Sequence, residues 1–184
     1  IRYVVNMGHQ VLNKDDFETI KFGTDGWRGI IGYDFNHYNL KIAVAASCQE
    51  LFYKYFKHVK SKKILIGYDR RFMASDFAKS IIPVVFGCGL EPVISKTYVT
   101  TPACSLYIKD HNFLGALIIT ASHNPYNWLG LKIKSFRGCS VDEDFTKEVQ
   151  NRIKLTKNIE EINSKYKSVD VKAYHLEIIK SRFN

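Results

Sequence analysis

Short apolar runs alternate along the chain with segments of helical periodicity, and this alternation restricts the fold more than any other feature. The runs Lys63–Tyr68, Glu91–Ser95 and Leu114–Thr120 have the length and composition of buried strands. Apolar residues recur every three or four positions over Leu40–Phe56 and from Phe77 to Cys88, which is typical of helices. Strands that alternate with helices form βαβ units. The sequence therefore predicts an α/β fold, a three-layer domain with a mixed, mainly parallel sheet covered by helices on both faces.

Local signals predict the remaining elements. The helix that starts near Phe77 is expected to continue through Pro83, and Thr101 is expected to cap a helix over Pro102–Lys109. Residues 156–168 are polar and have no period, which indicates a linker or a sheet edge. Further elements are expected as a strand over Leu131–Ser135 and helices over Asp142–Leu155 and Asp170–Phe183.

Composition excludes several classes of protein. Hydrophobic residues make up 46% and charged residues 24% of the chain, and no apolar run approaches the ~20 residues that span a bilayer. Residues 1–10 carry no secretion signal. The four cysteines form no CxxC pair, so free thiols in a cytoplasmic protein are expected, without membrane association.

The net charge of +9 suggests an anionic ligand. The basic residues do not form a stripe with exposed aromatics, and no nucleic-acid-binding motif is present. Nucleic acid is therefore not expected as a partner. Small anions such as phosphate esters suit the charge better.

The segment ITASHNPYNWLGLKIK, residues 119–134, interrupts two strand-like runs with polar residues. Ser122 is a candidate nucleophile and His123 a candidate base. A serine hydrolase is disfavoured because the GxSxG elbow is absent. Phosphoryl transfer needs a positioned oxygen and nearby cations, for which Ser122 and Lys132 are suited. A simple hydrophilic turn would also account for these residues.

Two other stretches are candidates for the same site. FGTDGWRG, residues 22–29, is either a tight turn or a compact loop in which Arg28 offers a planar fork to phosphate oxygens. GYDRR, residues 67–71, ends a predicted strand. We expect Asp69 to pair there with an arginine and to hold the loop.

Taken together and in this order, FGTDGWRG, GYDRR, TTP and TASHNP followed by GLK resemble the α-D-phosphohexomutases, the family of phosphoglucomutase and phosphomannomutase. The resemblance implies that Ser122 is a phosphoserine whose phosphate also binds a catalytic Mg²⁺ ion. It implies that Arg28 and Lys132 act on the transferring phosphate and that His123 supports Ser122. It places Thr24, Asp25 and Asn124 at the substrate.

The resemblance covers only part of the family's four domains. Residues 1–167 correspond to domain I, the phosphoserine domain, and residues 168–184 to a linker and the first helix of a truncated domain II. The DGDxD metal loop, the sugar-specificity loop and the phosphate loop of the last domain are absent from these residues. The remaining three domains are therefore expected as partners, and the chain alone is expected to be inactive. Leu129 stands where the family commonly has Asn.

The implied activity is the interconversion of hexose 1-phosphate and hexose 6-phosphate through a bisphosphorylated sugar, with Mg²⁺ as cofactor and glucose 1,6-bisphosphate as activator. Thr120 and FGTDGWRG favour glucose or mannose over glucosamine phosphates, because phosphoglucosamine mutases tend to show SASHNP. The alternative is a non-catalytic module that binds phosphosugars or polyanions.

Overall fold

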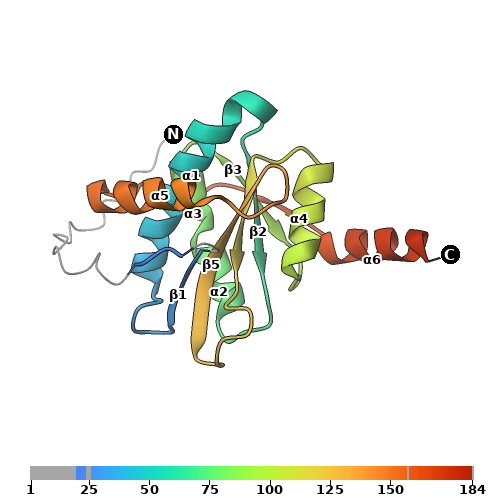
Figure 1. The fold of residues 1–184 in the computed structure, drawn as a ribbon, viewed down its shortest axis with the longest axis horizontal. Coiled ribbons are helices and arrows are strands. Elements are labelled where there is room, and N and C mark those ends of the chain that lie inside the picture. The colour runs from blue at the N-terminus through green and yellow to red at the C-terminus, as the bar shows by residue number, and fades with distance from the viewer. Residues whose placement is uncertain (1–19, 24–25, 157, 184) are drawn as a thin grey trace.

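The computed structural model describes residues 20–23, 26–156 and 158–183, and within them six strands form one sheet (Figure 1). In chain order the elements are β1 (Trp27–Ile30), α1 (His37–Val59), β2 (Lys63–Tyr68), α2 (Ala74–Ser80), α3 (Ile82–Gly87), β3 (Glu91–Ser95), α4 (Thr101–Asp110), β4 (Gly115–Ile119), β5 (Trp128–Ser135), α5 (Glu143–Leu155), β6 (Lys167–Val169) and α6 (Val171–Arg182).

The sheet has the strand order β1-β5-β4-β2-β3-β6. Strands β4, β2, β3 and β6 run parallel to one another, whereas β5 is antiparallel to both β4 and β1. The predicted mixed, mainly parallel sheet is confirmed. The antiparallel return of β5 places the loop between β4 and β5 at the carboxyl end of β4.

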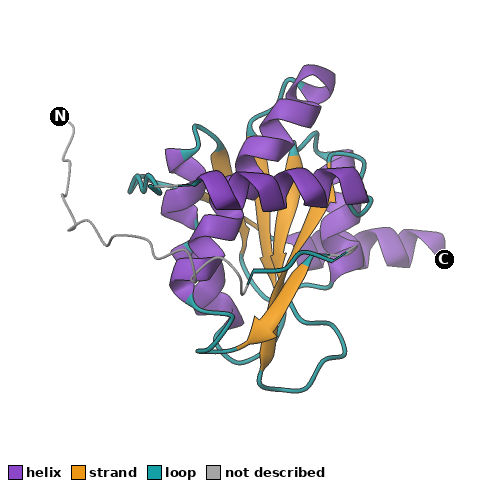
Figure 2. Cartoon of the chain, turned by 60° about the vertical axis from the view of Figure 1, so that its left-hand side comes forward, coloured by secondary structure: helices purple, strands orange, loops and turns teal. Residues whose placement is uncertain are grey.

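Helices cover both faces of the sheet, as predicted (Figures 1 and 2). Successive strand residues point to opposite faces, so β2 sends Ile64 and Ile66 into one core and Leu65 into the other. The first core lies under α1, α2, α3 and α5, and the second lies under α4. This three-layer arrangement explains why β4 is buried along its whole length.

The helix expected to continue through Pro83 is instead two helices, so that prediction is wrong. Helix α2 ends at Ser80, and α3 begins at Ile82 with Pro83 in its first turn. Proline lacks an amide hydrogen, which an interior helical position needs but a first turn does not.

The cap predicted for α4 is wrong by one residue. Thr100, not Thr101, is the N-cap, and its side chain accepts a hydrogen bond from the Ala103 amide at 3.4 Å. The adjacent threonines have equal capping chemistry. Only the extended backbone at Thr100 distinguishes them, with φ −84° and ψ 153°.

The polar stretch before α6 ends in an edge strand. Strand β6 pairs with β3, and the Tyr174 hydroxyl of α6 donates to Asp110 Oδ2 at 2.7 Å at the end of α4. Helix α6 then extends away from the sheet, to the right in Figure 1. The domain boundary expected between residues 167 and 168 stays a prediction.

The four cysteines are free thiols, as expected. Cys48 and Cys104 are buried, Cys88 is half-buried and Cys139 is exposed. Burial raises the pKa of Cys104 to about 12. Separately, no helix among the described residues has the length and apolar character needed to cross a membrane.

Truncating a buried side chain of the central strand β4 should lower the stability of the protein strongly. Leu117 of β4 is fully buried in the first core, so Leu117→Ala should lower the free energy of unfolding by about 2–5 kcal/mol. Urea denaturation would measure the loss. Leu155→Ala is the matched control, because that side chain is 76% exposed and should shift stability by less than about 0.5 kcal/mol. Equal effects of the two substitutions would contradict this packing.

Candidate functional site

The candidate site lies where the carboxyl ends of β2 and β4 meet. These strands are parallel neighbours, with Tyr68 opposite Ile119, so the loops that follow them leave the sheet side by side. The Asp69 amide donates to the Ile119 carbonyl at 3.2 Å and joins the two loop starts. The stretches GYDRR and TASHNP, which lie about fifty residues apart in the sequence, therefore form one surface.

Ser122 lies exposed in the loop, two residues after the buried Thr120. Its φ of +56° is in the left-handed region, which is uncommon for a residue with a side chain and occurs often at functional sites. Its Oγ lies 3.4 Å from Nδ1 of His123. The predicted pair of hydroxyl and imidazole is therefore brought together on the solvent side of the loop.

Arg71 holds the same loop from the side of β2. Its side chain is only 15% exposed. The guanidinium donates to four main-chain carbonyl oxygens, those of Ser122 at 2.8 Å, Asn124 at 2.6 Å, Pro125 at 2.7 Å and Trp128 at 3.1 Å. The sequence did not predict this contact, because nothing in GYDRR indicates which arginine reaches a distant loop.

Asp69 connects Arg71 to the start of the loop. One carboxylate oxygen accepts from the Arg71 amide at 2.9 Å, and the other lies 3.6 Å from Nε of Arg71. The predicted pairing of Asp69 with an arginine is confirmed. The Thr120 hydroxyl donates to Asp69 at 2.5 Å and accepts from the Ser122 amide at 3.1 Å, so a chain of hydrogen bonds runs from Asp69 to Ser122.

Arg28 and Lys132 lie on the two strands beside the loop. Arg28 of β1 is opposite Gly130 of β5, and Lys132 is opposite Ile118 of β4. Opposed residues share a face, so both cations lie on the face of the second core, where Ile118 is buried. A Cβ added to Gly130 would lie 2.8 Å from both Arg28 Cγ and the Thr120 carbonyl oxygen. Glycine therefore lets Arg28 cross close to the start of the loop.

The glycine-rich stretch also approaches this strand. The Gly23 amide donates to the Gly26 carbonyl at 2.8 Å. Gly26 has φ +109°, and a Cβ there would lie 2.1 Å from the Leu131 carbonyl oxygen. The loop thus contacts β5 beside Lys132. The predicted substrate residues Thr24 and Asp25, however, lie outside the described residues.

Asn124 is half-buried, and its Oδ1 is buried without a hydrogen-bond donor among the described residues. Within those same residues, no group of three or more His, Cys, Asp or Glu side chains could hold a metal ion. The binding of a metal ion through the phosphate of Ser122 stays a prediction.

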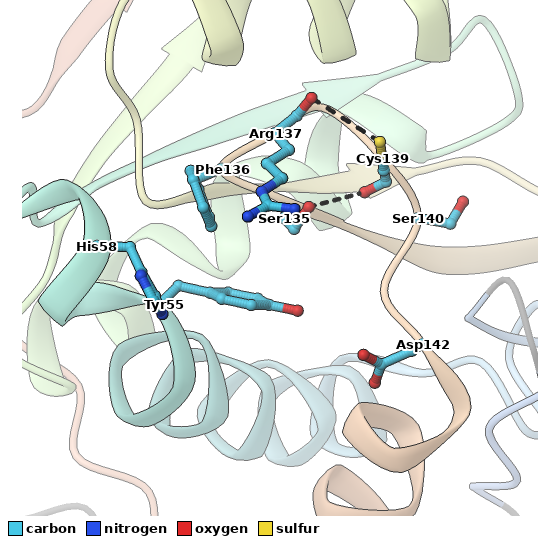
Figure 3. Close-up of a pocket in the computed structure, with 8 residues that line it drawn as sticks. All are labelled: Tyr55, His58, Ser135, Phe136, Arg137, Cys139, Ser140 and Asp142. Atoms are coloured by element: carbon cyan, nitrogen blue, oxygen red, sulfur yellow. Dashed lines mark hydrogen bonds between the residues drawn. The ribbon is translucent and has the colours of Figure 1, made fainter.

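One hollow among the described residues adjoins the site. This cavity has a volume of about 410 Å³ and is lined by residues that include Asp69, Arg71, Tyr98 and the start of α2. A second cavity of about 330 Å³ lies between the end of α1 and the segment after β5 (Figure 3). Because β5 runs antiparallel to β4, this second cavity is at the opposite end of the sheet from Ser122. None of the predicted site residues lines it.

Removing the Thr120 hydroxyl tests whether it anchors the Ser122 loop. Thr120→Val keeps the shape of the side chain but removes the hydrogen bond to the Asp69 carboxylate and the one from the Ser122 amide, and the loss of a hydrogen bond costs about 0.5–1.5 kcal/mol. Amide exchange at Ser122 should become faster and urea denaturation should show lower stability. Thr120→Ser retains the hydroxyl and should keep the slow exchange. Equal exchange in the two variants would show that the hydroxyl does not anchor the loop.

Comparison with known proteins gives one family. Residues 19–160 match the family model for phosphoglucomutase/phosphomannomutase, α/β/α domain I. The chain is 35% identical over 134 residues to a phosphoglucosamine mutase of Dictyoglomus turgidum, which covers 71% of this chain and 28% of that protein. It is 32% identical over 160 residues to a phosphoglucomutase of Staphylococcus haemolyticus, which covers 83% of this chain and 28% of that protein.

Solved structures show the same fold. A Thermus thermophilus protein assigned as a phosphomannomutase superposes with a TM-score of 0.79 at 27% identity, over 89% of this chain and 36% of that one. The open form of a Paramecium phosphoglucomutase, parafusin, superposes with a TM-score of 0.74 at 22% identity, over 93% of this chain and 36% of that one. The chain thus spans about a third of the length of the proteins that it matches.

Proposed function

Because the chain belongs to the phosphoglucomutase/phosphomannomutase family and matches its α/β/α domain I, we propose that it is the phosphoserine domain of a mutase that interconverts hexose 1-phosphate and hexose 6-phosphate. In the proposed cycle the phosphoryl group on Ser122 passes to the free hydroxyl of the sugar phosphate. The bond from phosphorus to the serine oxygen breaks as the bond to the sugar oxygen forms. The bisphosphate then reorients and returns its other phosphoryl group to Ser122.

The exposed, conformationally fixed Ser122 is the observation that carries this proposal. Phosphoryl transfer requires mainly that the oxygen be held in place and that cations neutralise the equatorial phosphate oxygens. The loop is anchored by Arg71 and Thr120, while the Ser122 hydroxyl stays on the solvent side beside His123. This combination of a fixed main chain and an accessible hydroxyl suits a group that must both give and receive phosphate.

Each remaining site residue has a role in the proposal. Arg28 and Lys132 stabilise the charge on the transferring phosphate, and Lys132 also serves as general acid or base. His123 hydrogen-bonds the Ser122 oxygen, from which its Nδ1 lies 3.4 Å. Thr24, Asp25 and Asn124 contact the substrate.

Glucose and mannose phosphates are the proposed substrates, with glucose 1,6-bisphosphate as the activator that phosphorylates Ser122. The similar relatives include both phosphoglucosamine mutases and phosphoglucomutases. The structure also weakens the sequence argument from Thr120, because its role is to hydrogen-bond through a hydroxyl that serine would equally supply. Sugar preference therefore needs to be measured.

A magnesium ion is proposed to bind the Ser122 phosphate, whose hard oxygens suit this ion. The described residues do not form a metal site by themselves. The other ligands would come from the further domains of the protein. For the same reason the chain alone is proposed not to complete a turnover.

Replacing the serine tests the reaction directly. In the protein encoded by the complete gene, Ser122→Ala should abolish conversion of glucose 1-phosphate to glucose 6-phosphate, because no oxygen remains to carry the phosphoryl group. A coupled assay with Mg²⁺ and a trace of glucose 1,6-bisphosphate measures the conversion. Ser164→Ala, at an exposed serine outside the site, should turn over normally. Activity that survives in Ser122→Ala would exclude the mechanism, whereas a folded wild-type protein that converts no sugar phosphate would favour a non-catalytic binding module.

The two cations predict graded losses. Arg28→Ala and Lys132→Ala should each lower kcat by about 100- to 1000-fold, since each removes positive charge from the transition state. Lys165→Ala, at an exposed lysine of the polar stretch before β6, is the charge-matched control and should leave kcat unchanged. Steady-state kinetics on both sugars would measure these values, and a loss confined to KM would assign the cations to substrate binding alone.

A further inference from the structure

Arg71 binds the Ser122 loop in a way that goes beyond a structural ion pair. Its two terminal nitrogens each donate to two carbonyl oxygens: one to those of Ser122 and Asn124, the other to those of Pro125 and Trp128. The contacts therefore begin at the reactive residue and end where β5 starts. A single side chain fixes the main chain over the whole turn.

The orientation of these carbonyls determines where the following amides point. In a planar trans peptide, the N–H of the next residue points opposite to the carbonyl, and the described residues contain no cis peptide. The His123 and Tyr126 amides follow two of the bound carbonyls, so they point away from the guanidinium. Neither amide donates to another described residue. Tyr126 is 89% exposed and His123 is exposed as well, so this is the open side of the loop.

One carboxylate faces the guanidinium of Arg71. Asp69 is its one acidic partner among the described residues, at 3.6 Å, and that carboxylate also accepts from Thr120. The remaining contacts are with neutral carbonyl groups. A largely buried guanidinium thus lies directly behind the loop that carries Ser122. Lysine could not reproduce the arrangement, because its ammonium is a point charge without the planar fork.

We propose that Arg71 is a positioning residue for phosphoryl transfer at Ser122. By donating hydrogen bonds to the four carbonyls, it holds Ser122 in its left-handed conformation. It also directs the His123 and Tyr126 amides to the open side of the loop, where they donate to the oxygens of the serine phosphate. The inference rests on the proposed mutase function. Arg71 touches neither substrate nor the transferring oxygen and acts through the main chain.

The test compares two neighbouring arginines in the protein encoded by the complete gene. Arg71→Gln should lower kcat by about 100-fold with KM close to the wild-type value, since a shift of about 1 Å in a reacting group has an effect of this size. Arg70→Gln is the matched control. The Arg70 guanidinium stacks on Tyr98, 3.7 Å from its ring centroid, and donates to the Tyr98 hydroxyl rather than to the Ser122 loop. It should therefore retain wild-type kcat.

A second variant covers the case in which Arg71→Gln does not fold. Arg71→Lys keeps the positive charge but loses the fork, so kcat should fall while KM and the thermal melting temperature change little. Single-turnover phosphorylation of Ser122 by glucose 1,6-bisphosphate should slow by the same factor as kcat. Hydrogen exchange should accelerate in a peptide covering residues 120–130 and stay unchanged elsewhere.

The outcomes separate this inference from the proposed function. If the wild-type protein converts the sugar phosphates and Arg71→Lys does so at the same kcat, the positioning role is wrong. If Arg71→Lys loses stability and kcat together, with faster exchange throughout the protein, the role is only structural and the inference is overturned. If the wild-type protein itself neither converts glucose 1-phosphate nor phosphorylates Ser122, it is the mutase proposal that fails.

Discussion

Strand β4 is the constraint on which the rest of the structure depends. All five of its residues are buried between the two helical layers, and it pairs in parallel with β2 on one side and antiparallel with β5 on the other. The parallel pairing brings the residues after β2 to the Ser122 loop. The antiparallel pairing makes that loop a connection between adjacent strands, so Gly130 and Lys132 return beside it. Pairing with one buried strand thus brings together the residues after β2, the Ser122 loop and the start of β5.

The loop itself illustrates how a polar connection can be rigid. The main-chain carbonyls of a turn need donors, which ordinarily come from other main-chain amides or from water. Here the guanidinium of Arg71 supplies four donors at once, and the buried Thr120 hydroxyl supplies an acceptor for Ser122. These contacts involve the main chain of Ser122. Its side-chain hydroxyl takes no part in them and lies exposed beside His123.

Leu129 shows how a departure from the family pattern is accommodated. Where the family commonly has asparagine, this chain places a side chain that is fully buried in the first core. The alternation along β5 directs Leu129 and Leu131 to that core and Lys132 to the opposite face, so the substitution leaves the face with Arg28 and Lys132 unchanged. The glycine at 130 matters more to that face, because Arg28 crosses directly over it.

The sequence by itself determined the α/β class, most element positions and the pairing of Asp69 with an arginine, because periodicity and turn chemistry are local properties. The roles of the motif residues stay predictions. Local signals failed at Pro83, which lies in the first turn of a second helix instead of inside one continuous helix. They also failed at Thr101, because the adjacent Thr100 has equal capping chemistry and only its extended backbone makes it the cap. Only the tertiary structure decided that Arg71 reaches the Ser122 loop and that Gly26 lies against β5. Contacts of that kind depend on which strands become neighbours, and strand order is set by burial of the whole sheet rather than by any short stretch of residues.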